Sequence, residues 1–206
     1  MGHPKFNHED FLGAALAIIA EQGVSGVTVA AVSERLGSPT GSFYHRFASR
    51  DVLLGSLWLQ AVSEFQAGIS AALGADGLGA ALHTPAWVRK HPDQARLLLL
   101  YDRKDFLQGE WPPELRERVA EMTQRIEAGS RRWARVIFGK AGREEIRLAQ
   151  FLISELPVAV VRQHLLRGEP PPQLIDRIIR ATYRAVLADY RTRKTRSRTQ
   201  RRNDGQ

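Results

Sequence analysis

Apolar residues recur at spacings of three and four along most of the chain, which is the pattern of helices with one buried face. The first such segment covers residues 7–22. Its inward positions are Phe11, Leu12, Ala15, Leu16 and Ile19. Asn7 and Asp10 have the spacing of a capping box, and Gly23 marks the end of the helix. Because the chain has no alternating strand pattern, it is predicted to be all-α.

A second, shorter helix is predicted between Thr28 and Leu36. The Thr28 hydroxyl can accept a hydrogen bond from a free backbone amide one turn into the helix. Val29, Val32 and Leu36 then follow at helical spacing and supply a buried face. Gly37 comes next, where glycine tolerates the left-handed conformation that ends a helix.

The next helix is predicted to begin with small and polar residues. Ser38 is expected to cap it, and Pro39 suits its first position, where a missing N–H has no consequence. Its slim first turn is made of Thr40, Gly41 and Ser42. A helix can approach base edges only if its leading turn is slim, and hydroxyl groups can donate or accept hydrogen bonds there.

The same short helix has an inner and an outer face. Phe43 and Phe47 lie four positions apart, so they share the buried face, whereas Tyr44 and His45 point away from it. Two short helices separated by a glycine turn favour a helix-turn-helix, which places its second helix in the DNA major groove.

These segments resemble the TetR family of bacterial transcriptional regulators over residues 8–58. The resemblance depends on the run from Ser42 to Phe47, SFYHRF, and on the run from Ser49 to Leu53, SRDVL, which opens a fourth helix. The family more often has lysine at the position of Arg50. Base and phosphate contacts to a double-stranded DNA operator are expected from Thr28, Ser38, Pro39, Thr40, Gly41, Ser42, Tyr44, His45 and Arg50.

The expected architecture is an N-terminal three-helix helix-turn-helix domain, residues 1–48, followed by a C-terminal helical ligand-binding and dimerisation domain, residues 49–190. Ser49 should cap the helix that links the two domains. Further helices are predicted at about 79–90, 93–103, from Pro112-Pro113 onward, at about 143–167, and at 172–190. Pro157 is expected to kink the helix that contains it.

The resemblance implies a homodimer that pairs through helices 143–167 and 172–190. It also implies a small-molecule effector, apolar or aromatic, within the second domain. The candidate lining residues are Trp87, Leu98, Tyr101, Phe106, Met122, Arg125, Trp133, Phe151 and Glu155, with Ser154 nearby. The alternative is that these residues are ordinary core and that Gly129 only permits close helix packing. The predicted role is repression, although activation is also compatible with the sequence.

The net charge of +8 is not located in the predicted DNA-reading domain. Residues 1–70 hold four cations against six acids, whereas residues 191–206 hold seven cations and one acid. This tail is predicted to be disordered, and it either binds DNA non-specifically or only aids solubility. The acidic balance of residues 1–70 supports an alternative function, a ligand-binding protein that has lost operator binding and acts through a protein partner.

Other classes of protein find no support in the sequence. The chain has no cysteine, which excludes disulfides and fits a cytoplasmic protein. No apolar run is long enough to span a membrane. The six histidines do not form a metal cluster, and no nucleophile, base and oxyanion set is present, so neither an enzyme nor a cofactor is expected.

Overall fold

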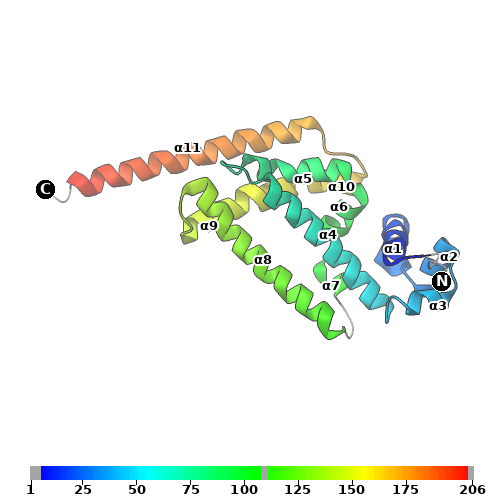
Figure 1. The fold of residues 1–206 in the computed structure, drawn as a ribbon. Coiled ribbons are helices and arrows are strands. Elements are labelled where there is room, and N and C mark those ends of the chain that lie inside the picture. Colours follow the sequence, from blue (N-terminus) through cyan, green and yellow to red (C-terminus); the bar gives the residue numbers. More distant parts are fainter. Residues whose placement is uncertain (1–5, 108–110, 204–206) are drawn as a thin grey trace.

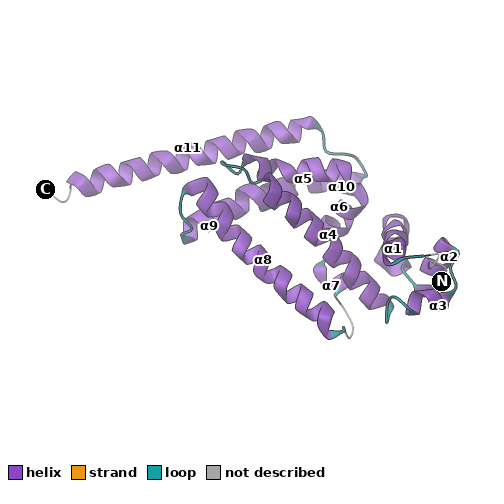
Figure 2. Cartoon of the chain, in the orientation of Figure 1, coloured by secondary structure: helices purple, strands orange, loops and turns teal. Residues whose placement is uncertain are grey.

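The computed structural model describes residues 6–107 and 111–203, with side chains up to Arg196. Within these ranges every regular element is a helix and no strand occurs, which confirms the all-α prediction (Figures 1 and 2). None of these helices combines the length and apolarity that crossing a bilayer requires. The described residues also bring together no group of three acidic or histidine side chains that could hold a metal ion.

The amino-terminal helices form a small head, seen on the right of Figure 1. Its elements are α1 (His8–Gln22), the 3₁₀ turn η1 (Val24–Gly26), α2 (Val29–Leu36) and α3 (Thr40–Tyr44). The predicted capping box is confirmed, because the Asp10 amide donates to Asn7 Oδ1 at 3.0 Å and the Asn7 amide donates to Asp10 Oδ2 at 2.6 Å. The helix ends before Gly23, whose φ of 77° is one that L side chains rarely adopt.

Helix α4 (Arg50–Ala72) links the head to the rest of the molecule. Ser49 caps it as predicted, because its Oγ accepts from the Val52 amide at 3.2 Å. The first half of α4 contributes Leu53, Leu54 and Leu57 to a hydrophobic cluster that includes the core of the head and also Leu97, Phe106 and Leu115 of later helices. Its second half contributes Phe65 and Ile69 to the cluster of the second domain. One continuous helix of about 35 Å therefore belongs to both cores.

Seven further helices and one π-helical turn complete the chain. They are α5 (Leu78–Lys90), α6 (Pro92–Leu100), α7 (Arg103–Phe106), α8 (Pro113–Phe138), α9 (Arg143–Gln150), the π-helical turn η2 (Phe151–Glu155), α10 (Leu156–Arg167) and α11 (Gln173–Asn203). Most of the expected helices are present, but the short α7 was not predicted, and α6 ends before the expected residue 103.

The structure accommodates Pro157 through a π-helical turn. A proline inside an α-helix removes one hydrogen bond and clashes with the carbonyl four residues earlier. The π-helical turn η2 lies immediately before this proline, so α9, η2 and α10 follow one another without a break. The expected disturbance therefore takes the form of one widened turn, which is a known way of relieving a helix interruption.

The beginning of α11 is fastened to α5 by Arg89. Its Nε donates to the Pro171 carbonyl at 2.7 Å, and two of its nitrogens donate to the Asp176 carboxylate at 3.1 and 2.8 Å. Such a two-pronged guanidinium–carboxylate pair holds a fixed geometry. Arg89 therefore sets where α11 starts on the body of the protein.

A second fastening joins α11 to the α8–α9 corner through Glu145. This carboxylate is 2% exposed, and its Oε1 accepts from Tyr190 Oη at 2.6 Å and pairs with Lys140 Nζ at 2.8 Å. Burial, the largest single effect, raises the pKa of Glu145. The hydrogen bonds from Lys140, Tyr190 and its own backbone, with the charge of Lys140, outweigh burial and lower that pKa to about 2.

Replacing Glu145 with glutamine is expected to reduce the free energy of unfolding near neutral pH by about 1–3 kcal/mol. Because the folded pKa of about 2 lies below the ordinary value of 4.5, the contribution of this carboxylate is complete above pH 4.5 and is lost as the pH falls toward 2. Denaturant unfolding should therefore show a gap between parent and variant that shrinks by about pH 3. Glu127 of α8, which is exposed, is the matched control when changed to glutamine. An equal gap between parent and Glu145→Gln at both pH values would contradict the assignment.

The C-terminal tail differs from the prediction. Disorder was expected from Arg191 onward, but α11 continues as helix through Asn203. An existing helix can be extended at little cost, because the unfavourable nucleation step has already been made. Residues 204–206, the end of the predicted tail, lie outside the described residues.

Candidate nucleic-acid interface

The turn between α2 and α3 has the geometry that the sequence predicted, except at one residue. Thr28 Oγ1 accepts from the Ala31 amide at 3.0 Å, and Gly37 takes the left-handed conformation, with φ of 61° and ψ of 33°. Ser38 does not cap α3, because the N-cap residue is Pro39 and no side chain bonds to the free amides there. The Ser38 hydroxyl is instead buried, without a hydrogen-bond partner among the described residues. The prediction that Ser38 is the cap is therefore wrong.

The outer side of α3 is exposed and slim. Pro39, Thr40, Gly41 and His45 are exposed, and Ser42 is partly so. The Tyr44 side chain is 58% exposed, although it is large and mainly apolar. A Cβ added at Gly41 would meet no atom within 4 Å, so free space surrounds the leading turn. Six of the nine predicted contact residues therefore lie together around one protruding helix.

The inner side of α3 is locked to α1 by aromatic rings. Phe43 and Phe47 are 0% and 1% exposed, and their ring centroids lie 5.9 and 6.2 Å from that of Phe11 in edge-to-face arrangements. Buried aromatic pairs of this geometry contribute energy beyond the apolar area they remove from water. The five-residue helix is thus held by its two phenylalanines, which leaves its opposite side free.

Arg46 tightens the same attachment. It donates to the Ser42 carbonyl at 2.8 Å and to the Phe6 carbonyl, and its guanidinium lies 5.4 Å from the centre of the Phe11 ring. A cation above an aromatic face is attracted by the negative ring surface. This arginine therefore supports α3 from beneath and does not face outward from it.

Arg50 has a structural role that the sequence did not suggest. Its Nε donates to the Val27 carbonyl and its Nη2 donates to the Val24 carbonyl at 2.9 Å, while Nη1 lies 3.3 Å from Asp51 Oδ1. Since these two carbonyls belong to the segment that leads into α2, Arg50 joins the start of α4 to the start of α2. A phosphate contact by Arg50 remains a prediction, and such a contact would have to share a guanidinium that is already bonded.

Most cationic side chains of the head are held by other groups of the protein. Of the four cations in residues 1–70, Arg35 is ion-paired with Glu21, whereas Arg46 and Arg50 are held by backbone carbonyls. Lys5 lies outside the described residues. The protruding surface of α3 is therefore polar and nearly neutral, so hydrogen bonds and shape are better suited than charge to act there.

The predicted effector residues pack in different parts of the described structure. Three of them, Met122, Arg125 and Trp133, lie together in a groove of about 200 Å³ between α4 and α8. Gly129 also lines this groove, where a Cβ would lie 3.8 Å from the Trp133 ring. The groove is therefore the candidate effector site that the structure offers, with a different lining from the one predicted.

The other predicted effector residues are occupied elsewhere. Trp87 is packed on Phe65, with ring centroids 4.9 Å apart, and the Tyr101 and Phe106 rings pack on each other. Glu155 is exposed and ion-paired with Arg147. Leu98 and Phe151 pack against the hydrophobic clusters. For the apolar residues among them the core interpretation fits this packing, and effector binding by all six stays a prediction.

The α4 side of the groove was not predicted from the sequence. This side consists of Ser63, Gln66, Ala67 and Ser70. These small or polar residues recur at helical spacing on a helix whose other faces are largely apolar, so the break in apolar character was a signal that could have found them.

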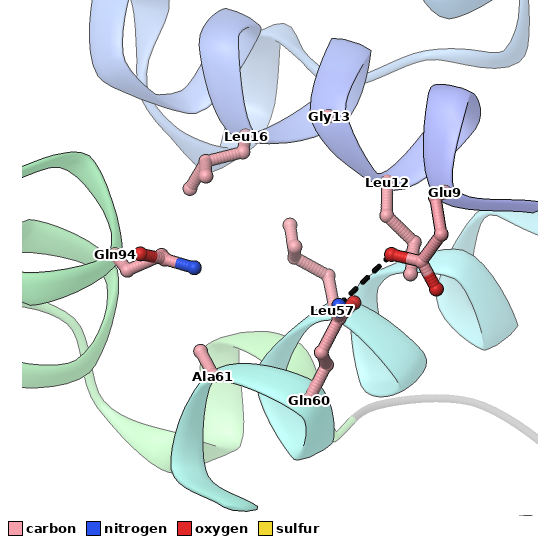
Figure 3. Close-up of a pocket in the computed structure, with 8 residues that line it drawn as sticks. All are labelled: Glu9, Leu12, Gly13, Leu16, Leu57, Gln60, Ala61 and Gln94. Carbon is pink, nitrogen blue, oxygen red and sulfur yellow. Dashed lines mark hydrogen bonds between the residues drawn. The ribbon is translucent and has the colours of Figure 1, made fainter. Parts of the chain in front are cut away.

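A second hollow, of about 160 Å³, lies where the head meets the rest of the protein. Figure 3 shows α1 above it with Gly13 at its edge, Gln60 of α4 below, and Gln94 of α6 at the side. Gln60 Nε2 donates to Glu9 Oε2 at 2.9 Å, so one hydrogen bond crosses from α4 to the head. The apolar lining is made by Leu12 and Leu16 of α1 and by Leu57 and Ala61 of α4. A Cβ added at Gly13 would meet nothing within 4 Å.

Large apolar side chains are exposed where α10 ends and α11 begins. In the described part of the chain, Leu166 is 68% exposed, Leu174 50% and Ile178 40%. These residues belong to the two helices that were predicted to pair in a dimer. An exposed apolar cluster of this kind is a common sign of a protein interface.

Comparisons with known proteins agree with this arrangement. Residues 11–57 match the family described as bacterial regulatory proteins, tetR family. No curated protein sequence matches the chain. Solved structures of similar fold include the fatty acid degradation regulator FadR from Bacillus halodurans, with 17% identity, a TM-score of 0.61 and coverage of 91% of this chain and 96% of that one.

Two further solved structures give values in the same range. The ketosteroid transcriptional regulator KstR2 of Mycobacterium tuberculosis has 19% identity and a TM-score of 0.60, covering 91% of this chain and 96% of that one. The transcriptional regulator FadR from Bacillus subtilis in complex with stearoyl-CoA has 16% identity and a TM-score of 0.60, covering 88% and 96%. At such identities the likeness establishes the fold.

Proposed function

We propose that this chain is a homodimeric DNA-binding repressor that a small molecule releases from its operator, because residues 11–57 match the family described as bacterial regulatory proteins, tetR family. The observation that carries the proposal is the protruding outer side of α3, with Tyr44 58% exposed and Phe43 fully buried beneath it. A large exposed ring on a helix that is rigidly held from behind is suited to contact DNA. We place the boundary between the reading head and the regulatory domain at residues 48 and 49.

We assign the dimer contact to α10 and α11. The exposed Leu166, Leu174 and Ile178 support this assignment, because a second copy would cover them. A dimer presents two copies of α3, which can contact two operator half-sites about one helical turn of DNA apart. The chain should therefore sediment as a dimer at micromolar concentration, and a strictly monomeric mass would contradict this part of the proposal.

The effector site is assigned to the groove between α4 and α8. Its α4 side is polar, through Ser63, Gln66 and Ser70, and Met122 and Trp133 make the opposite side apolar. Such a lining suits an apolar or aromatic compound with a few polar groups. Regulators of similar fold include one in complex with stearoyl-CoA and one for ketosteroids, so ligands of apolar character are compatible with this architecture.

The size of the groove supplies a mechanism. A volume of about 200 Å³ lies below the range of roughly 300–1,000 Å³ that drug-sized ligands occupy. A larger effector would thus have to move α4 and α8 apart. Since α4 also belongs to the core of the head, such a movement would change the spacing of the two α3 helices. The ligand shifts the population toward that second arrangement only to the extent that it binds the second arrangement more tightly than the first.

The hollow beside Gly13 provides a test of this mechanism. Glycine within a helix costs about 1 kcal/mol relative to alanine, so Gly13→Ala is expected to raise the free energy of unfolding by about that amount. Gly13→Leu also fills the space between α1, α4 and α6, and is expected to hold the head in its present position. Operator binding should persist in both variants, whereas effector release from Gly13→Leu should need a higher ligand concentration in a gel-shift titration. Equal release of both variants would show that the head does not move here.

A gel shift and footprint on DNA beside the protein's own gene test the whole proposal. A protected, two-fold symmetric site that candidate apolar ligands abolish is the expected result. Ligand binding without any protected DNA would instead favour the competing function, a ligand-binding protein that acts through a protein partner. The net acidic charge of residues 1–70 is the observation that supports this second function.

A further inference from the structure

Helix α11 extends well beyond the part that packs on the protein. Among the side chains of α11 that the structure describes, Tyr190, 7% exposed, is the last buried one, and all of residues 191–196 are exposed. The helix nevertheless runs on to Asn203, which adds about 20 Å. Figure 1 shows this extension projecting at the left end of the molecule, whereas α3 lies at the right end. We call residues 191–203 the arm.

The arm consists of cationic and polar residues. Its sequence is RTRKTRSRTQRRN, with seven cations, no acid and no apolar residue. Several cations lie three or four positions apart, such as Lys194 and Arg198, and like charges at this spacing destabilise a helix. A partner that carries closely spaced negative charges would remove this repulsion.

The base of the arm is tied to the body, so its direction is set. Arg193 donates to Asp189 Oδ2 at 2.8 Å and to Glu144 Oε1 at 3.0 Å. Lys194 Nζ lies 5.7 Å from the centre of the Tyr190 ring, and Tyr190 is itself bonded to the buried Glu145. The first turn of the arm is therefore fixed to the body of the protein. The cations from Arg196 onward come after this fixed turn in the sequence.

We propose that the arm binds duplex DNA without sequence preference, on a segment other than the one that α3 reads. A duplex carries one negative charge per about 1.7 Å of its axis, which matches a short helix dense in arginine. Because the arm and α3 of one chain lie at opposite ends of the molecule, they cannot both contact the same short operator (Figure 1). Such a contact would raise the local concentration of the regulator on the chromosome or hold two DNA segments together.

The composition of the arm favours DNA over two other partners. Insertion into a membrane interface requires an apolar helix face, and residues 191–203 contain no apolar residue. A second copy of the arm is disfavoured by like charge. The arm also does not depend on the proposed operator function, because non-specific binding to phosphates needs no reading helix.

The test uses the full chain with Arg196, Arg198, Arg201 and Arg202 all changed to glutamine, which leaves the anchored base intact. The matched control changes Arg116, Arg118, Arg131 and Arg132, four exposed arginines of α8, in the same way. Affinity for a short random-sequence duplex is measured over a series of salt concentrations. Each phosphate contact contributes about −0.9 to the slope of log affinity against log salt, so the arm variant, which lacks four arginines, should lose about 3.6 from the slope and at least about tenfold in affinity at low salt.

The control should retain the slope and affinity of the parent. An arm variant that binds as the parent does, or a control that loses as much, overturns the proposal, because the arm would then have no special part in binding. Loss of binding to vesicles of phosphatidylserine and phosphatidylcholine, with unchanged DNA binding, would overturn it in favour of a lipid surface. The arm variant keeps Tyr44 and the rest of α3, so it should still protect the operator in a footprint at low salt. Failure of the operator function and failure of the arm are therefore separately visible.

Discussion

Replacing Tyr44 with alanine is expected to weaken operator binding by about tenfold to a hundredfold, with little change in the free energy of unfolding. The side chain is 58% exposed, and its main contact in the protein is the edge of the Phe43 ring, with centroids 5.4 Å apart. Its removal therefore takes a contact from the DNA complex and little from the folded protein. The measurements are a gel-shift titration on the footprinted operator and thermal unfolding of both proteins.

Further variants identify which group acts. Tyr44→Phe keeps the ring and removes the hydroxyl, so it separates a hydrogen bond to phosphate from ring contact. Thr40→Ala tests the leading turn of α3 and is expected to weaken binding by a comparable factor. Gln124→Ala, at an exposed position of α8, is the matched control and should bind as the parent does. If Thr40→Ala and Tyr44→Ala both bind as tightly as the parent, the outer side of α3 is not the reading surface.

The sequence predicted the head well, because local rules decide most of its structure. A hydroxyl at Thr28, a glycine at position 37 and a serine at position 49 each act within one turn of their own helix, and the structure confirms all three. The spacing of Phe43 and Phe47 likewise predicts burial without knowledge of what they pack against. Ser38 is the exception, since Pro39 occupies the N-cap position and the hydroxyl is buried.

The effector groove could not be predicted in the same way, because helices distant in sequence form it. Residue type indicated that Trp87 and Trp133 are buried, but only the packing of α4 on α8 decides that Trp133 lines a groove and Trp87 does not. The role of Arg50 is also tertiary, since its carbonyl partners lie 23 and 26 residues earlier. Composition alone could not distinguish disorder from helix at the C-terminus, because a high density of like charge disfavours both a packed core and an isolated helix. In the folded chain the segment is not isolated, since it extends the existing helix α11.

Replacing Phe43 with alanine is expected to lower the free energy of unfolding by about 3–5 kcal/mol. The side chain is 0% exposed and contacts Phe11 and Phe47, so truncation leaves a cavity beneath α3 that the five-residue helix has few other contacts to offset. Phe43 and Tyr44 are neighbours in one helix, but the first side chain is buried and the second exposed, so their variants should weaken operator binding for different reasons. Tyr44→Ala binds the operator more weakly and keeps the fold, whereas Phe43→Ala binds it more weakly because the head loosens.

Denaturant unfolding and a gel shift, both at the same temperature, distinguish the two cases. Phe43→Leu is the control, because it keeps a large apolar side chain and leaves a smaller cavity than Phe43→Ala, and it should restore most operator binding. A Phe43→Ala protein that unfolds and binds DNA as the parent does would mean that the aromatic contacts with α1 do not hold α3 in place. The protruding surface would then have no rigid support, and the argument that it is built to enter a DNA groove would lose its physical basis.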